Sequence, residues 1–154
     1  MARFQWNALN KQQVGAFAEY FVKMELTMYG FEVYTTEVDD RGIDFVARRG
    51  TSPFIEVQVK SLRNYGYVFM QKAKFELRPN VYLALAMMFD GQPPRLYFIP
   101  ATTWLTPNGV FVDRCFEGLQ SKPEWGCNLS RRNMAALEPF EFDTIIQSIG
   151  VAQR

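Results

Sequence analysis

Apolar residues recur every three or four positions in the N-terminal part of the chain, at Val14, Phe17, Phe21, Met24 and Met28. This spacing is the period of an α-helix. Asn10 precedes the series and Gln13 follows three residues later, a pair that favours a capped helix start. Gly30 suits the left-handed backbone position just beyond a helix end. The pattern predicts a helix over about 11–29.

A different pattern follows, in which short apolar or alternating runs are separated by turn residues. Strands are expected over 31–35, 43–48, 54–61, 65–70, 81–89, 95–99 and 110–112. Thr36–Gly42 is interpreted as a polar turn. Five residues separate the strands 43–48 and 54–61, which predicts an antiparallel hairpin. The run 81–89 is apolar almost throughout, as expected of a strand buried on both faces.

Short helices are expected over 72–77, 100–104, 133–137 and 143–149, with Asp143 capping the last. Ser121–Gly126 is interpreted as a loop, with Trp125 packed in the core or at an oligomer contact. No repeat or linker divides the chain. We therefore expect one α/β domain over 1–154, with a mixed central β-sheet flanked by helices, a core at about 10–99 and a C-terminal extension at about 100–154.

Composition narrows the chemistry. The chain contains no histidine, which excludes serine-histidine triads, cysteine-histidine dyads and the HExxH zinc site. Cys115 and Cys127 have no metal-binding spacing, and no apolar run reaches the ~20 residues of a membrane helix. Without a recognisable secretion signal, we expect free thiols and a cytoplasmic location. An enzyme built from this chain must use carboxylates, amides, lysines and a hard metal ion.

Charge is unevenly distributed although the formal net charge is only +1. The segment 41–78 contains eight Lys/Arg and three Asp/Glu, whereas the flanking segments are acidic on balance. A basic central segment suits a polyanion such as nucleic acid, and a solvated strand surface is the alternative interpretation. The candidate nucleic-acid contacts are Arg41, Arg48, Arg63, Lys72 and Lys74.

Candidate chemistry is concentrated in the predicted hairpin. Glu56, Gln58 and Lys60 share one face of the second strand because side chains alternate with period two. If the five-residue loop sets the register, Asp44 lies opposite Gln58, with Cβ atoms ~4.5–5.5 Å apart. A carboxylate and an amide oxygen at that separation can hold a hard divalent cation, and Lys60 can face a phosphate. An exposed polar stripe is the alternative.

These residues resemble the PD-(D/E)xK nuclease superfamily, including its resolvase-like, Mrr-like and homing-endonuclease branches. Asp44 matches the first acidic residue, Gln58-Val59-Lys60 matches the second element in its glutamine variant, and Glu19 matches the helical acid. The expected order of helix, three strands, short helix and strand over 10–89 also resembles the family core. Gln58 replaces an acidic residue, and Glu56 on the same face can supply the missing carboxylate.

The resemblance implies Mg²⁺-dependent hydrolysis of DNA phosphodiester bonds, with Mn²⁺ able to substitute, and Asp44, Gln58, Glu19 and Glu56 as candidate metal ligands. Double-stranded or branched DNA is the expected substrate, and cutting two strands implies a homodimer or a higher symmetric oligomer. No membrane partner is expected. Two alternatives stay open: a catalytically silent nuclease fold that serves as a binding module, and an unrelated α/β domain.

Overall fold

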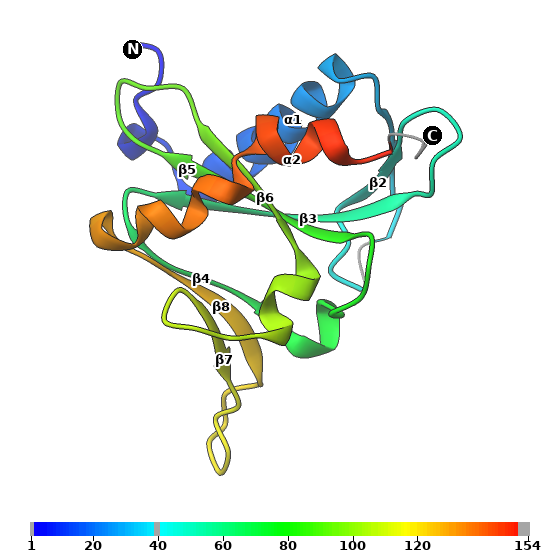
Figure 1. The fold of residues 1–154 in the computed structure, drawn as a ribbon. Helices are drawn as coiled ribbons and strands as arrows, with labels where there is room; N and C mark the ends of the chain where they lie inside the picture. Colours follow the sequence, from blue (N-terminus) through cyan, green and yellow to red (C-terminus); the bar gives the residue numbers. More distant parts are fainter. Residues whose placement is uncertain (1, 39–40, 151–154) are drawn as a thin grey trace.

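The chain is folded around a mixed five-stranded β-sheet in a computed structural model that describes residues 2–38 and 41–150 (Figure 1). In chain order the strands are β1 (Glu32–Thr35), β2 (Phe45–Arg48), β3 (Ile55–Arg63), β5 (Val81–Met88) and β6 (Arg95–Pro100). They lie side by side in that order, with β3 and β5 parallel and the other neighbouring pairs antiparallel. The predicted α/β fold class is confirmed.

The predicted hairpin is formed by β2 and β3, in the expected register: Phe45 lies opposite Val57, and Ala47 opposite Ile55. β2 begins at Phe45, two residues later than predicted, because the chain turns into the strand through Gly42, whose φ is +77°. The predicted turn at 36–42 contains residues 39 and 40, which lie outside the described residues.

The predicted N-terminal helix is α1 (Lys11–Met28), which begins with the expected reciprocal capping box between Asn10 and Gln13. Its buried side chains are Val14, Ala18, Val22 and Leu26. The apolar series that predicted the helix is largely on another face, since Met24 is 60% and Met28 81% exposed. Four-residue spacing occurs on both faces, and the face with smaller side chains packs on the sheet.

A second helix, α2 (Phe142–Ser148), packs beside α1 on the same face of the sheet (Figure 1). Phe142 and Ile146 join the buried cluster that contains Val22 and Leu26 of α1. The predicted cap at Asp143 is wrong, because the capping position is Glu141 and makes no side-chain cap bond. Asp143 lies in the first helical turn and accepts a hydrogen bond from the Tyr29 hydroxyl at 2.7 Å.

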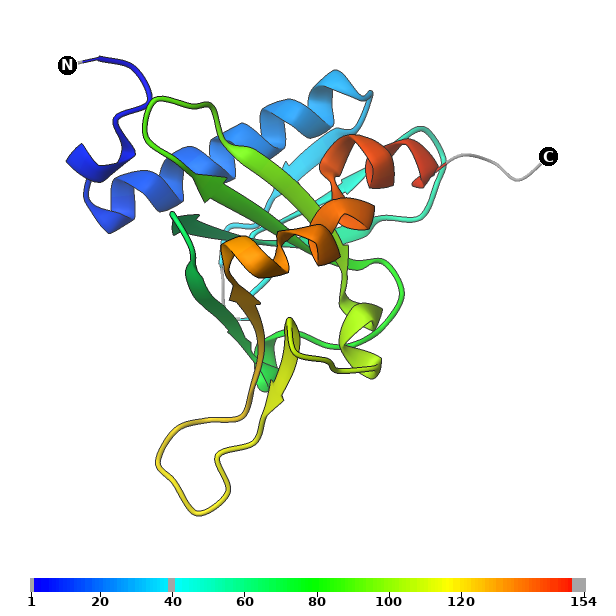
Figure 2. The ribbon, with the colours of Figure 1, turned by 60° about the vertical axis from the view of Figure 1, so that its left-hand side comes forward.

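The opposite face of the sheet is covered by a second, antiparallel sheet (Figures 1 and 2). Its strands, in spatial order, are β4 (Gly66–Gln71), β8 (Glu124–Leu129) and β7 (Phe111–Arg114). The C-terminal extension therefore supplies two of its strands. β8 was not predicted, because Glu124 and Gly126 interrupt the alternation that identifies a strand, although both are buried. The loop from β7 to β8 projects away from the body of the protein (Figure 2).

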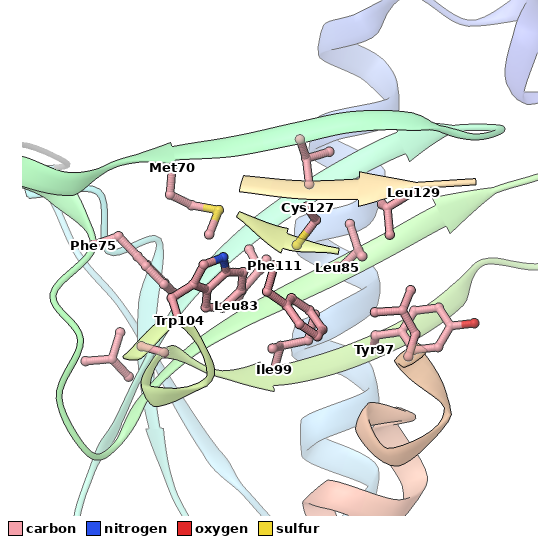
Figure 3. Close-up of a cluster of buried hydrophobic side chains, with 14 of the residues drawn as sticks. Met70, Phe75, Leu83, Leu85, Tyr97, Ile99, Trp104, Phe111, Cys127 and Leu129 are labelled. Atoms are coloured by element: carbon pink, nitrogen blue, oxygen red, sulfur yellow. The ribbon is translucent and has the colours of Figure 1, made fainter. Parts of the chain in front are cut away.

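A large apolar cluster fills the space between the two sheets (Figure 3). Trp104 is buried in this cluster and donates a hydrogen bond from Nε1 to the Gly126 carbonyl at 2.9 Å. Trp125 is half-buried against the same cluster. Cys127 is buried there and Cys115 is exposed. Both cysteines are free thiols, as predicted. Burial raises the pKa of the Cys127 thiol to about 12.

The chain also forms 3-10 segments at Trp6–Ala8, Lys72–Lys74, Ala101–Leu105 and Arg131–Phe140. The predicted helix over 72–77 is thus reduced to one turn, because Phe75 leaves the turn in an extended conformation and enters the core, where it is 2% exposed. Among the described residues, no helix has the length and apolar character needed to cross a lipid bilayer.

Candidate functional site

The polar face of β3 is turned toward the second sheet. Ile55 and Val57 are buried in the cluster beneath α1 and α2, so Glu56, Gln58 and Lys60 point to the opposite side by strand alternation. Asp44 immediately precedes β2. Its register position, one step beyond the Phe45–Val57 pair, is opposite Gln58, as the sequence predicted.

Hydrogen bonds to β3 hold Asp44 in position. Its backbone N–H donates to the Val57 carbonyl at 3.0 Å, and its side-chain Oδ2 accepts from the Val59 N–H at 2.6 Å. The carboxylate therefore lies directly against β3, and its orientation is set by the backbone of that strand. A residue held in this way cannot simply be a solvated turn residue, because it is half-buried and tied to the neighbouring strand.

Asp44, Gln58 and Lys60, on which the sequence prediction depends, all line one cavity of about 370 Å³. Its lining residues are Gly42, Asp44, Gln58, Val59, Lys60, Phe69, Gln71 and Lys74. Gly42 permits a close approach of the Lys74 backbone. A Cβ atom at Gly42 would lie 2.7 Å from the Lys74 carbonyl oxygen, and the positive φ also favours glycine there. We call this cavity the Asp44 pocket.

Gln58 contributes a buried amide oxygen for which the described residues provide no hydrogen-bond partner. A buried acceptor without a partner costs about 1–3 kcal/mol, so such atoms are uncommon in folded proteins. A donor or a hard cation in the Asp44 pocket would satisfy it. The donor set therefore fits a divalent cation such as Mg²⁺, with one carboxylate and one amide oxygen from the protein.

A second cavity of about 300 Å³ adjoins the Asp44 pocket and shares Gly42, Gln58 and Lys74 with it. Arg41, Glu56 and Arg78 line this neighbouring cavity. The Glu56 carboxylate forms an ion pair with the Arg78 guanidinium, which also bonds Glu76 at 2.8 Å. These hydrogen bonds, with that to Glu56 the larger influence, raise the pKa of Arg78. Glu56 therefore shares the positive charge of Arg78 with Glu76.

Glu19 is not among the residues that line either cavity. It lies on α1, which covers the other face of the sheet, and its carboxylate pairs with Lys23 at 3.0 Å. Within 2–38 and 41–150, no three acidic, cysteine or histidine side chains are grouped closely enough to form a metal cluster. The geometry thus brings Asp44, Gln58 and Lys60 together, with Glu56 next to them and Glu19 apart.

Of the predicted nucleic-acid contacts, some line the two cavities and others lie elsewhere. Lys74 lines both cavities and Arg41 lines the second. Arg63 is directed elsewhere, since its guanidinium donates to the Leu9 carbonyl at 2.6 Å and to the Trp6 carbonyl at 3.3 Å. Arg63 therefore holds the N-terminal segment against the end of β3.

Lys72 and Arg48 already have protein partners. Lys72 forms an ion pair with Asp113 and lies 4.0 Å from the centre of the Trp125 ring. Arg48 lies at the far end of the hairpin, 4.7 Å over the Phe54 ring. Sequence reasoning missed Phe69 and Gln71, which reach the Asp44 pocket from β4. No local signal identified them, because β4 follows β3 but belongs to the second sheet, where it pairs with the distant strand β8.

Comparison with known proteins identifies the fold. No family model and no curated protein matches the sequence. Among solved structures, the chain is similar to Hjc, a Holliday junction resolvase from Archaeoglobus fulgidus, with a TM-score of 0.53 and 14% identity over 90% of this chain and 98% of that one. It is also similar to the bacterial homing endonuclease I-Ssp6803I, with a TM-score of 0.52 and 14% identity over 90% of this chain and 92% of that one.

At 14% identity these likenesses establish the fold alone, which this chain shares with the resolvase and the homing endonuclease. They also extend over more of the chain than the segment 10–89 that carried the sequence resemblance.

Proposed function

We propose that this protein is a metal-dependent nuclease that hydrolyses phosphodiester bonds in DNA. The observation that carries the proposal is the convergence of Asp44, Gln58 and Lys60 on one pocket, where the described residues offer the buried Gln58 amide oxygen no hydrogen-bond partner. The fold supports it, because two similar structures are a Holliday junction resolvase and a homing endonuclease. Such an activity would act on DNA in the cytoplasm.

Each residue has a distinct role in this proposal. Asp44 and Gln58 supply the protein oxygens for Mg²⁺ or Mn²⁺, which would polarise the scissile phosphate and lower the pKa of an attacking water. The Val59 N–H holds the Asp44 carboxylate in place. Lys60 places an ammonium group beside the phosphate and offsets the negative charge that develops in the transition state.

The two remaining acidic candidates have weaker support. Glu56 shares the Gln58 face but is paired with Arg78, and Glu19 is paired with Lys23. The Glu56 carboxylate must leave Arg78 before it can reach a cation bound at Asp44, whereas Glu19 lies on α1, on the other face of the sheet. We therefore propose a site in which waters and substrate phosphate oxygens complete the coordination, as is common for Mg²⁺.

The test compares conservative variants of the pocket with a matched lysine control. Asp44→Asn retains an oxygen that can accept from the Val59 N–H but removes the charge, and Lys60→Met retains most of the side-chain volume. Each is expected to reduce cutting of plasmid, branched or single-stranded DNA about 100-fold or more in Mg²⁺ or Mn²⁺. Lys11→Met, at the exposed start of α1, should cut like the wild type.

The same experiment evaluates the catalytically silent alternative. Salt-sensitive DNA binding without cutting in either metal, unchanged in Asp44→Asn, would support a binding module instead of an enzyme. If the wild-type protein binds no DNA or RNA, both functions are refuted.

A homodimer is part of this proposal for duplex substrates, because two strands require two cuts. α1 offers an apolar surface away from the Asp44 pocket, where Tyr20 is 67%, Met24 60% and Met28 81% exposed. Exposed apolar patches of this kind often mark protein contacts. Light scattering over a range of protein concentrations, with and without duplex DNA, measures the assembly state; a monomer under all conditions would contradict the dimer.

A further inference from the structure

Phe69 connects the Asp44 pocket with the outer face of the second sheet. It lines the pocket together with Asp44, Gln58 and Lys60, yet 46% of its surface is exposed. Its neighbours on β4, Val68 and Met70, are buried in the core, so the Phe69 ring is on the outer face by strand alternation. An exposed phenyl ring at the rim of a polar pocket contributes little to the core, and it offers a flat apolar surface to a ligand.

Tyr67 extends this surface along the same strand. The Tyr67 and Phe69 rings are nearly parallel, with an angle of 19° between their planes and 6.3 Å between their centroids. The Tyr67 hydroxyl donates to the carboxylate of Glu124, which is 8% exposed. Burial, followed by this hydrogen bond, raises the pKa of Tyr67 far above its usual range. The phenol therefore stays a donor at neutral pH and anchors its ring.

Gly126 and Arg114 hold the Tyr67 ring between them. A Cβ atom on Gly126 would lie 2.0 Å from the Tyr67 hydroxyl oxygen, so the ring lies directly against the β8 backbone. The Arg114 guanidinium lies 4.1 Å over the ring centroid, within the range of a cation–π contact. The outer face of the sheet thus presents a fixed aromatic pair with a cationic group on it, beside a pocket that contains Lys60 and Lys74.

The chemistry of this surface suits a nucleobase attached to a phosphate backbone. Aromatic rings and guanidinium groups stack on bases, while the neighbouring ammonium groups attract the phosphates. Base faces inside a duplex are covered by their neighbours, so only an unpaired base can stack on Phe69. We propose that Phe69, supported by Tyr67 and Arg114, stacks an unpaired base next to the bond cut at the Asp44 pocket. This inference rests on the proposed nuclease function and narrows its substrate to DNA with single-stranded or branched segments.

A fluorescent base tests the contact directly. DNA carrying unpaired 2-aminopurine in a flap, and a matched duplex without unpaired bases, are titrated with protein in EDTA and again with Ca²⁺ to limit cutting. Stacking on an aromatic ring quenches 2-aminopurine. The wild type should quench the flap probe, whereas Phe69→Leu, which retains an apolar side chain but loses the ring, should not. Phe69→Ala should weaken flap binding about 5- to 150-fold and leave duplex binding unchanged.

Phe54→Ala is the matched control, because Phe54 is a phenylalanine of similar exposure (44%) that lines neither the Asp44 pocket nor the neighbouring cavity. This variant should quench 2-aminopurine and bind both DNAs as the wild type does. Urea unfolding midpoints establish that each variant is folded.

Two results would overturn the inference while leaving the proposed function intact: quenching by Phe69→Leu equal to that of the wild type, or equal loss of flap and duplex binding in Phe69→Ala. If the wild type binds neither DNA, the proposed function fails together with the inference.

Discussion

Gly126→Ala is predicted to destabilise the protein through Tyr67, although the same substitution usually stabilises a strand. The new Cβ would lie 2.0, 2.4 and 2.5 Å from the Oη, Cζ and Cε2 atoms of the Tyr67 side chain. No real contact is that short, so the ring must leave its place. Gly126 does not have a positive φ, and alanine itself is therefore compatible with the backbone.

The size of the effect follows from the contacts that the displaced ring loses. Removing the hydroxyl from the buried Glu124 carboxylate costs about 1–3 kcal/mol, and losing the Arg114 contact costs about 0.5–1 kcal/mol. Replacing glycine by alanine in a compatible strand returns about 0.5–1 kcal/mol, chiefly through the unfolded state. We expect Gly126→Ala to reduce the free energy of unfolding by about 1–3 kcal/mol.

A double-mutant cycle separates this mechanism from a general defect in β8. In a Tyr67→Ala background the ring is absent, so Gly126→Ala should become stabilising by about 0.5–1 kcal/mol. The measurement is urea unfolding of all four proteins, compared at equal m-value. Equal destabilisation in both backgrounds would refute the reasoning, because Gly126 would then matter for a reason other than space for Tyr67.

Three further predictions concern the site, the thiols and the assembly. Gln58→Glu places a second carboxylate beside Asp44, so its unfolding temperature in EDTA should be lower than that of the wild type. Mg²⁺ should raise the unfolding temperature of this variant more than that of the wild type, as measured by thermal unfolding without DNA. Cys115 should react with a thiol reagent in the native protein at pH 8, and Cys127 only after unfolding, since it is buried with its pKa raised to about 12. Met24→Lys should shift any dimer toward monomer in light scattering without altering the cutting of single-stranded DNA, because Met24 is 60% exposed on α1.

The predicted register shows which features of the site can be obtained from local sequence. A five-residue loop and the period-two alternation of strands were sufficient to place Asp44 opposite Gln58, and both relations involve residues fewer than 20 positions apart. Phe69 could not be found in this way. It reaches the pocket because β4 leaves the first sheet and pairs with β8, where Phe69 lies opposite Gly126. A partner more than 50 residues away leaves no periodic signal near Phe69.

The distribution of charge along the sequence also predicted phosphate contacts that the fold does not offer, for a related reason. Lys72 has the composition and the position of a phosphate contact, but Asp113, which lies 41 residues later, occupies its ammonium group. Arg63 is likewise bonded to carbonyl groups of the N-terminal segment. The basic character of 41–78 is a property of the chain, whereas the charge that faces the pocket depends on which cations the fold has already paired.

In the proposed nuclease, the charge of the Asp44 pocket accounts for a glutamine at position 58. Among the described lining residues, Asp44 is the one carboxylate, whereas Lys60 and Lys74 are both cationic. Such a pocket attracts an anionic phosphate more readily than it attracts a free cation. The phosphate oxygens then provide the negative ligands that the neutral Gln58 amide does not. Substrate and cation should therefore strengthen each other's binding reciprocally. A low affinity for Mg²⁺ without DNA would thus be consistent with an enzyme, whereas an affinity that DNA leaves unchanged would indicate the silent binding module.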